Sequence, residues 1–119
     1  MENKLVLEGL SKQMKYQRLK ESIRLAIASS IFDVNHFKIG KTGQTIDDRF
    51  NKSTYKDDYK GIVPLHWSED PDVISQLEAD LIEEFKSNSK YDSICDNERT
   101  TDKDEMKDSD CYILYMVWN

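Results

Sequence analysis

The residues just before the C-terminal asparagine form an uninterrupted apolar segment. From Cys111 to Trp118 the sequence reads Cys-Tyr-Ile-Leu-Tyr-Met-Val-Trp and contains no charged side chain. Side chains alternate between the two faces of a β-strand, so a strand that is apolar at every position is buried on both faces. We therefore expect residues 111–118 to form a strand at the centre of a small sheet.

A first helix is expected near residues 10–23. Apolar residues recur there at helical spacing, and basic residues occupy much of the remaining surface. These basic residues are Lys12, Lys15, Arg18 and Lys20. No glycine or proline ends the pattern, so residues 24–30 can be read either as the last turns of this helix or as a separate strand.

A second helix is expected over residues 71–86, where the apolar residues form one clean stripe. Asp70 is suited to cap its first turn, and Pro71 is suited to the first helical position. A shorter helix is expected near residues 45–51, with Thr45 as its N-cap.

Two more strands are expected near residues 37–41 and 60–67. Pro64 lies inside the second and lacks a backbone N–H, so it should lie at a sheet edge or at a bulge. Residues 87–110 are polar and acidic and are expected to form a long loop. Together these elements predict a single α+β domain over residues 1–119, with a small central β-sheet flanked by helices.

Charge is distributed unevenly along the chain. The net charge is -6 at pH 7, but residues 1–60 carry 12 basic against 8 acidic side chains, and residues 61–119 carry 5 against 15. The acidic total argues against indiscriminate binding to nucleic acid, because affinity for the phosphate backbone comes largely from lysine and arginine. A local basic face in the first half remains compatible with it.

Two cysteines and two histidines exclude a disulfide-rich scaffold and a Cys/His zinc site. The chain has no apolar run near the roughly 20 residues that cross a bilayer, and it begins without the basic and apolar stretches of a secretion signal. We therefore expect a cytoplasmic domain with no membrane partner.

A series of short motifs runs in order from Phe37 onward. Phe37-Lys38-Ile39-Gly40-Lys41-Thr42-Gly43 precedes Asp47-Asp48-Arg49-Phe50, and the helix that follows carries Glu78. Cys95-Asp96-Asn97 and Tyr112-Ile113-Leu114-Tyr115 come later. In this order and spacing the chain resembles the GIY-YIG nuclease superfamily, in particular the branch whose second motif reads Tyr-Lys-Ile-Gly-Lys-Thr. The likeness covers about 80 residues.

The resemblance implies an endonuclease that hydrolyses DNA phosphodiester bonds with one divalent ion, Mg²⁺ or Mn²⁺. Arg49 would hold the scissile phosphate, and Glu78 would ligate the metal ion. Lys38, in register with the family's second tyrosine, is the third residue placed at the catalytic centre. The residues implied in substrate binding are Gly40, Lys41, Thr42 and Asn97, together with Lys15 and Arg18 of the basic helix. Catalysis requires Arg49 and Glu78 to converge on a shared cleft beside residues 37–41.

Two tyrosines of the family pattern are missing. The stretch 24–30, where the first motif would lie, contains no tyrosine, and Lys38 replaces the second. Activation of the attacking water would then depend on another group. The candidates are Tyr16, Tyr55, Tyr59 and His36. The alternative is a catalytically inactive domain of the same fold that binds nucleic acid or a protein partner.

Overall fold

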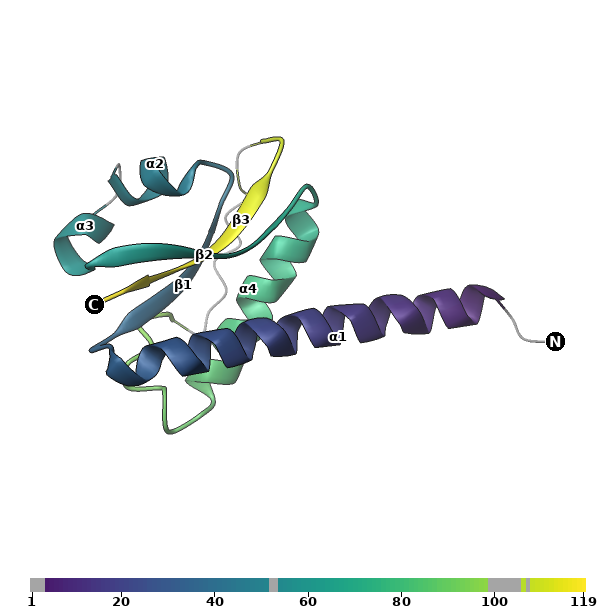
Figure 1. The fold of residues 1–119 in the computed structure, drawn as a ribbon, viewed down its shortest axis with the longest axis horizontal. Helices are drawn as coiled ribbons and strands as arrows, with labels where there is room; N and C mark the ends of the chain where they lie inside the picture. The colour runs from purple at the N-terminus through teal and green to yellow at the C-terminus, as the bar shows by residue number, and fades with distance from the viewer. Residues whose placement is uncertain (1–3, 52–53, 99–105, 107) are drawn as a thin grey trace.

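The computed structural model describes residues 4–51, 54–98, 106 and 108–119, and for residues 4–11 it describes the backbone alone. Within these ranges the sheet consists of β1 (Phe37–Thr42), β2 (Gly61–Ser68) and β3 (Tyr112–Trp118). The strand order is β1-β3-β2, and both pairings are antiparallel. The C-terminal strand is therefore the central one, as its apolar sequence predicts (Figure 1).

Four α-helices surround this sheet in the described part of the chain. They are α1 (Lys4–Ser30), α2 (Ile46–Asn51), α3 (Tyr55–Asp58) and α4 (Pro71–Lys86), and a 3₁₀ turn, η1 (Ile31–Asp33), follows α1. The α+β fold class and the helix at 71–86 are confirmed. The short helix α3 is not predicted by the sequence, because a single turn is too brief to have a periodic pattern.

The structure resolves the ambiguity at residues 24–30 in favour of a helix. These residues continue α1, which extends beyond the predicted 10–23 at both ends. Isoleucines at four-residue spacing form one buried row along the end of α1 and into the following turn, and helical geometry alone brings that spacing onto one face. They are Ile23, Ile27 and Ile31.

Strand β2 is irregular where the sequence predicts it. The pairing of β2 with β3 shifts between Pro64 and His66, and β2 lies at an edge of the sheet. Both facts agree with a proline that has no N–H to donate. At the start of α4 the Asp70 side chain accepts a hydrogen bond of 2.9 Å from the backbone N–H of Asp72, which confirms the predicted cap.

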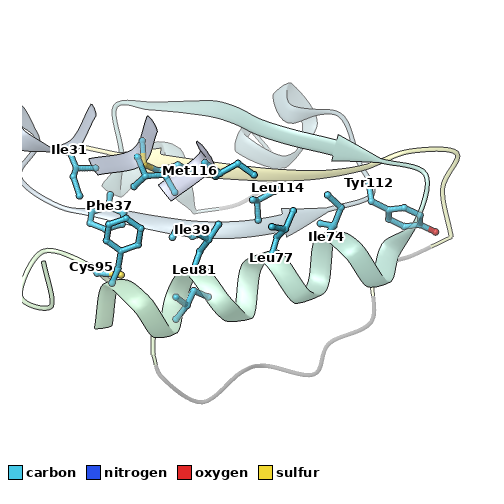
Figure 2. Close-up of a cluster of buried hydrophobic side chains, with 14 residues drawn as sticks. Ile31, Phe37, Ile39, Ile74, Leu77, Leu81, Cys95, Tyr112, Leu114 and Met116 are labelled. Atoms are coloured by element: carbon cyan, nitrogen blue, oxygen red, sulfur yellow. The ribbon is translucent and has the colours of Figure 1, made fainter. Parts of the chain in front are cut away.

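One face of the sheet packs against α4 and the end of α1 and forms the main core. Ile74, Leu77 and Leu81 project from α4 toward the strands (Figure 2). The strands contribute a matching set of apolar side chains to this core, among them Phe37, Ile39, Leu114 and Met116. Each such buried side chain contributes about 1.5–3 kcal/mol to stability.

The opposite face of the sheet is covered by α2 and α3 (Figure 1). Strand alternation assigns Tyr115 to this face, because its neighbours Leu114 and Met116 belong to the core on the α4 side. Gly40 and Pro64 are the residues that pair with Tyr115 in the two edge strands, so they lie on this face as well.

The remaining part of α1 extends away from the sheet (Figure 1). It is tied to α4 by the Tyr16 hydroxyl, which donates a hydrogen bond of 2.6 Å to Asp80. None of the helices in the described ranges combines the length and the apolar character needed to cross a bilayer.

Candidate functional site

Tyr115 lies directly over Gly40 on the face covered by α2 and α3. A Cβ atom added to Gly40 would lie 2.4 Å from Cζ of the phenol, so only glycine lets the ring approach β1 this closely. The Tyr115 side chain is fully buried. Its hydroxyl oxygen accepts a hydrogen bond of 3.0 Å from Nε of Arg49 and lies 2.9 Å from the hydroxyl of Tyr55.

The first turn of α2 holds Arg49 in place. The Thr45 hydroxyl accepts a hydrogen bond of 3.2 Å from the N–H of Asp48, and the Thr45 carbonyl accepts one of 2.9 Å from the N–H of Arg49. This confirms Thr45 as the N-cap. Because Nε is engaged by Tyr115, the guanidinium is fixed in orientation, and the remaining N–H groups of its planar fork suit an oxyanion.

Two cations lie against the ring of Tyr55. The Arg49 Cζ is 5.3 Å from the ring centroid, and the Nζ of Lys38 is 5.8 Å from it. Both cations lie within the range in which an aromatic face stabilises positive charge. Among the described residues, no carboxylate forms an ion pair with Lys38 or Arg49. The cluster of Lys38, Arg49, Tyr55 and Tyr115, called here the Arg49 centre, is therefore positively charged.

The Tyr115 phenol is protonated at neutral pH. Burial raises its pKa, the neighbouring Tyr55 raises it further, and the hydrogen bond from Arg49 opposes the shift only in part. A fully buried, protonated phenol does not act as a base toward water. Its role at this centre is to hold the guanidinium.

Glu78 projects from α4 and reaches β1 from the other face of the sheet. Its Oε1 lies 3.8 Å from Nζ of Lys41, which also donates a hydrogen bond of 3.2 Å to the Ser75 hydroxyl. Lys41 directly follows Gly40 in β1, so the two residues point to opposite faces. Arg49 therefore lies near Gly40 on one face of β1, and Glu78 lies near Lys41 on the opposite face. The two side chains do not share a cleft on a single face of the sheet.

As the predicted metal ligand, Glu78 would contribute one carboxylate. Within the described residues there is no group of three or more His, Cys, Asp or Glu side chains that could hold a metal ion. Mg²⁺ keeps several of its waters and is commonly held by one or two carboxylates together with substrate phosphates. A single carboxylate is therefore compatible with Mg²⁺ bound jointly by Glu78, water and a substrate phosphate.

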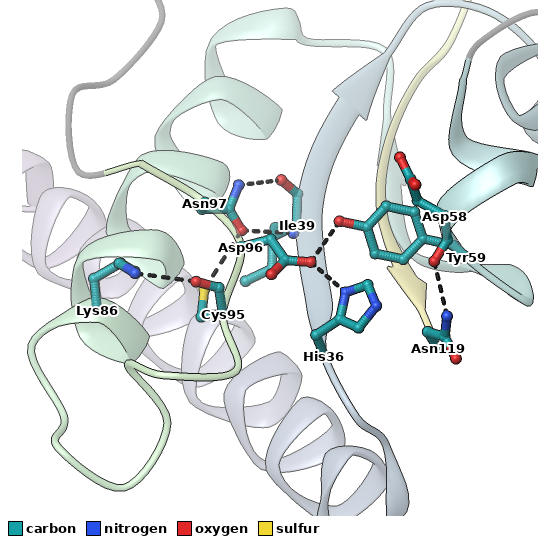
Figure 3. A network of polar contacts seen from close by, with 9 residues as sticks. All are labelled: His36, Ile39, Asp58, Tyr59, Lys86, Cys95, Asp96, Asn97 and Asn119. Atoms are coloured by element: carbon teal, nitrogen blue, oxygen red, sulfur yellow. Dashed lines mark hydrogen bonds and ion pairs between the residues drawn. The ribbon is translucent and has the colours of Figure 1, made fainter.

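Asn97 is buried at the outer edge of β1. Its Oδ1 accepts a hydrogen bond of 2.8 Å from the N–H of Ile39, and its Nδ2 donates one of 2.8 Å to the Ile39 carbonyl (Figure 3). The side-chain amide thus takes the place of a neighbouring strand. The resemblance implies Asn97 as a substrate-binding residue, but in the structure its side-chain amide is hydrogen-bonded to the backbone of Ile39.

Asp96 binds two of the candidate bases. It accepts a hydrogen bond of 2.6 Å from the Tyr59 hydroxyl and lies 2.5 Å from Nδ1 of His36 (Figure 3). Burial and the Asp96 carboxylate both raise the pKa of Tyr59. Tyr16 is bound to Asp80 on the α4 side of the molecule. Of the four candidates, Tyr55 is the one that belongs to the Arg49 centre.

The other predicted substrate-binding residues lie apart from this centre. Lys15 and Arg18 are exposed on α1. Thr42 is buried, and its hydroxyl accepts a hydrogen bond of 3.0 Å from the N–H of Gln44, so it shapes the turn after β1. Cys111, expected in the closing strand, precedes β3 and is only half-buried.

Tyr115 is the residue of the centre that the sequence does not single out. The stretch 24–30 contains no tyrosine, whereas the last strand of the chain places Tyr115 beside Gly40 and Arg49. The available signal was the predicted central position of that strand, which implied pairing with β1. Comparison with models of known families, with curated proteins and with solved structures finds no match for this chain.

Proposed function

We propose that this domain is a divergent GIY-YIG-like endonuclease that hydrolyses DNA phosphodiester bonds with one divalent ion. Because Arg49 and Glu78 do not share the expected cleft, the proposal requires that the substrate cross the end of β1 and contact Arg49 from one face and a metal ion at Glu78 from the other. The observation that carries the proposal is the contact of Tyr115 with both Gly40 and Arg49. The resemblance assigns Gly40 and Arg49 to the site, and Tyr115 of β3 contacts both. The thiols of Cys95 and Cys111 are free, in keeping with the reducing cytoplasm that we propose as its location.

Arg49 holds the scissile phosphate in this proposal. Its guanidinium is permanently charged, and the hydrogen bond to Tyr115 fixes its orientation before substrate arrives. A preorganised donor of this kind stabilises the charge that develops on the phosphate oxygens in the transition state. Lys38, which also lies against the Tyr55 ring, adds a second positive charge to the same phosphate or its neighbour.

Glu78 is the residue that would hold Mg²⁺ or Mn²⁺. When bound, such an ion polarises the phosphate and stabilises the leaving oxygen. Lys41 contacts the same carboxylate and keeps it oriented toward the end of β1. Tyr55 is half-buried, unlike Tyr115, and we assign to its hydroxyl the positioning of the attacking water by a hydrogen bond, with the proton of that water passing to bulk solvent.

A metal-dependent cleavage assay tests this function. The full chain should nick a supercoiled plasmid in Mg²⁺ or Mn²⁺ and lose this activity in EDTA, in Arg49→Ala and in Glu78→Gln. The matched controls are Arg24→Ala, an arginine on α1, and Glu83→Gln, an exposed glutamate on α4, and both should cleave as the unaltered protein does. Absence of cleavage with either metal would overturn the enzymatic proposal.

The ion pair of Glu78 with Lys41 favours a second candidate. An ammonium group beside the only assigned metal ligand weakens the attraction of that carboxylate for a cation. A catalytically inactive domain would keep the Arg49 centre and bind nucleic acid without cutting it. In that case affinity should fall steeply with salt and show no dependence on metal. Failure of the chain to bind DNA at low salt would instead indicate a protein partner.

A further inference from the structure

Trp67 is an exposed aromatic side chain near the end of β2. It is 65% exposed, whereas most large apolar side chains of the strands are buried. Exposed tryptophan is common at binding surfaces, because its large ring offers contact area at a small entropic cost. The position of Trp67 relative to the Arg49 centre decides what it can bind.

The irregularity in β2 turns Trp67 toward the face of the sheet that carries Tyr115. Val63 and Leu65 pack against the core on the α4 side, and regular alternation would send Trp67 there too. The register shift between Pro64 and His66 reverses this order, so that His66 pairs with Leu114 and Trp67 pairs with Ile113. Redirecting a side chain is a common use of a β-bulge.

Trp67 therefore shares its face with the Arg49 centre. Its partner Ile113 lies two residues from Tyr115 along β3, a step of about 7 Å. The tryptophan ring is thus one strand away from Tyr115, whose hydroxyl holds Arg49, whereas Lys38 pairs with Val117 and lies two residues farther along the sheet. A ligand held by these cations would extend across the sheet to Trp67.

The charges around Trp67 indicate which part of a nucleic acid would lie there. The next residues along the chain include Glu69 and Asp70, both exposed, and their negative charge disfavours a phosphate. A nucleobase is neutral and offers a flat face to an aromatic ring, and its N–H groups are compatible with nearby carboxylates. The face thus has cations for a phosphate and, beside them, an aromatic ring for a base.

We propose that Trp67 stacks on an unpaired base of the DNA strand whose phosphate is bound by Arg49. The preferred substrate is then single-stranded DNA or a duplex with splayed bases, because paired bases do not present their faces. This inference rests on the nucleic-acid binding of the proposed function, and it specifies the class of substrate.

Tryptophan fluorescence tests the proposal directly. The chain has two tryptophans, Trp67 and Trp118, so Trp67→Phe leaves a single emitter as the reference. Oligo(dT) of about twelve nucleotides, added to the full chain in EDTA to prevent cleavage, should quench the emission of Trp67 and leave that of the Trp67→Phe variant unchanged. The affinity for oligo(dT) should fall about 5- to 150-fold in Trp67→Ala and by much less in Trp67→Phe.

The controls separate this inference from the proposed function. Phe32→Ala removes an aromatic side chain that is 80% exposed near the end of α1, and it should leave the affinity unchanged. The same sequence as a duplex should bind more weakly, with no effect of Trp67→Ala. If Arg49→Ala abolishes binding while Trp67→Ala does not alter it, stacking is wrong and the Arg49 site stands. If neither variant changes binding, both the stacking of Trp67 and the binding of phosphate by Arg49 are wrong.

Discussion

Nε of Arg49 donates a hydrogen bond of 3.0 Å to the hydroxyl of Tyr115, although 66 positions separate the two residues. The contact exists because the last strand of the chain inserts between β1 and β2. It couples the short helix α2 to the centre of the sheet, so a buried residue of the central strand fixes the guanidinium.

Replacing Tyr115 with phenylalanine tests this coupling. The ring still fits, but Nε of Arg49 and the hydroxyl of Tyr55 lose their shared partner in a buried place. We expect the free energy of unfolding to fall by about 1–3 kcal/mol, as measured by urea denaturation. The affinity for oligo(dT) should fall as well, because the guanidinium is no longer held. Unchanged affinity would show that Arg49 does not need Tyr115.

Gly40→Ala should disturb the packing of the Tyr115 ring against β1. The new Cβ would overlap the buried Tyr115 ring at 2.4 Å, and we expect a loss of about 1–3 kcal/mol from overpacking. Gly61→Ala is the comparison variant, because its Cβ would meet Trp118 at 2.9 Å, near the end of β3 where the half-buried ring can shift. Thermal denaturation should show a larger drop for Gly40→Ala. Equal drops would contradict a special role for Gly40.

Asn97→Ala separates a structural role from a binding role. The substitution leaves the N–H and carbonyl of Ile39 without the amide that now pairs with both. The expected cost is about 1–3 kcal/mol in the free energy of unfolding. Asn97→Asp keeps the acceptor for the N–H and loses the donor to the carbonyl, so its stability should be intermediate. A variant of full stability but weak DNA binding would restore Asn97 to the binding site.

Alkaline pH should destabilise the fold through its tyrosines. Burial raises the pKa of Tyr16, Tyr59 and Tyr115 above the ordinary value of 10.0, and carboxylates raise it further at the first two. The phenols hold their protons more tightly in the folded chain than in the unfolded chain. Their contribution to the free energy of unfolding is therefore complete below about pH 9 and is lost as the pH rises above about 10. Urea midpoints measured between about pH 8 and 11 should fall accordingly. Tyr16→Phe should reduce the slope, and an unchanged slope would contradict the assignment.

Local patterns in the sequence predicted most of the fold. The Asp70–Pro71 start of α4, the cap at Thr45 and the irregularity at Pro64 each depend on a residue whose backbone chemistry has few alternatives. The central position of residues 111–118 followed from their apolar character on both faces. Long-range burial, by contrast, decided that residues 24–30 are helical, through Ile27 and Ile31.

The candidate site was predicted less completely. Arg49 and Glu78 come from short motifs, but a motif does not specify the face from which each side chain approaches β1. The strand order determines that, and strand order is a property of the whole chain. Tyr115 was missed for the same reason, since its neighbours in sequence are core residues and only the pairing with Gly40 shows its role.

The salt dependence of DNA binding shows whether Arg49 binds a phosphate, because each neutralised phosphate releases counterions. The affinity for oligo(dT) should be measured in EDTA over a range of salt concentrations for the unaltered chain, for Arg49→Gln and for Arg24→Gln, whose arginine is paired with Glu21 on α1. We expect Arg49→Gln alone to weaken binding and to lower the slope of log affinity against log salt by about 1. An Arg49→Gln variant with the affinity and slope of the unaltered chain would contradict the account.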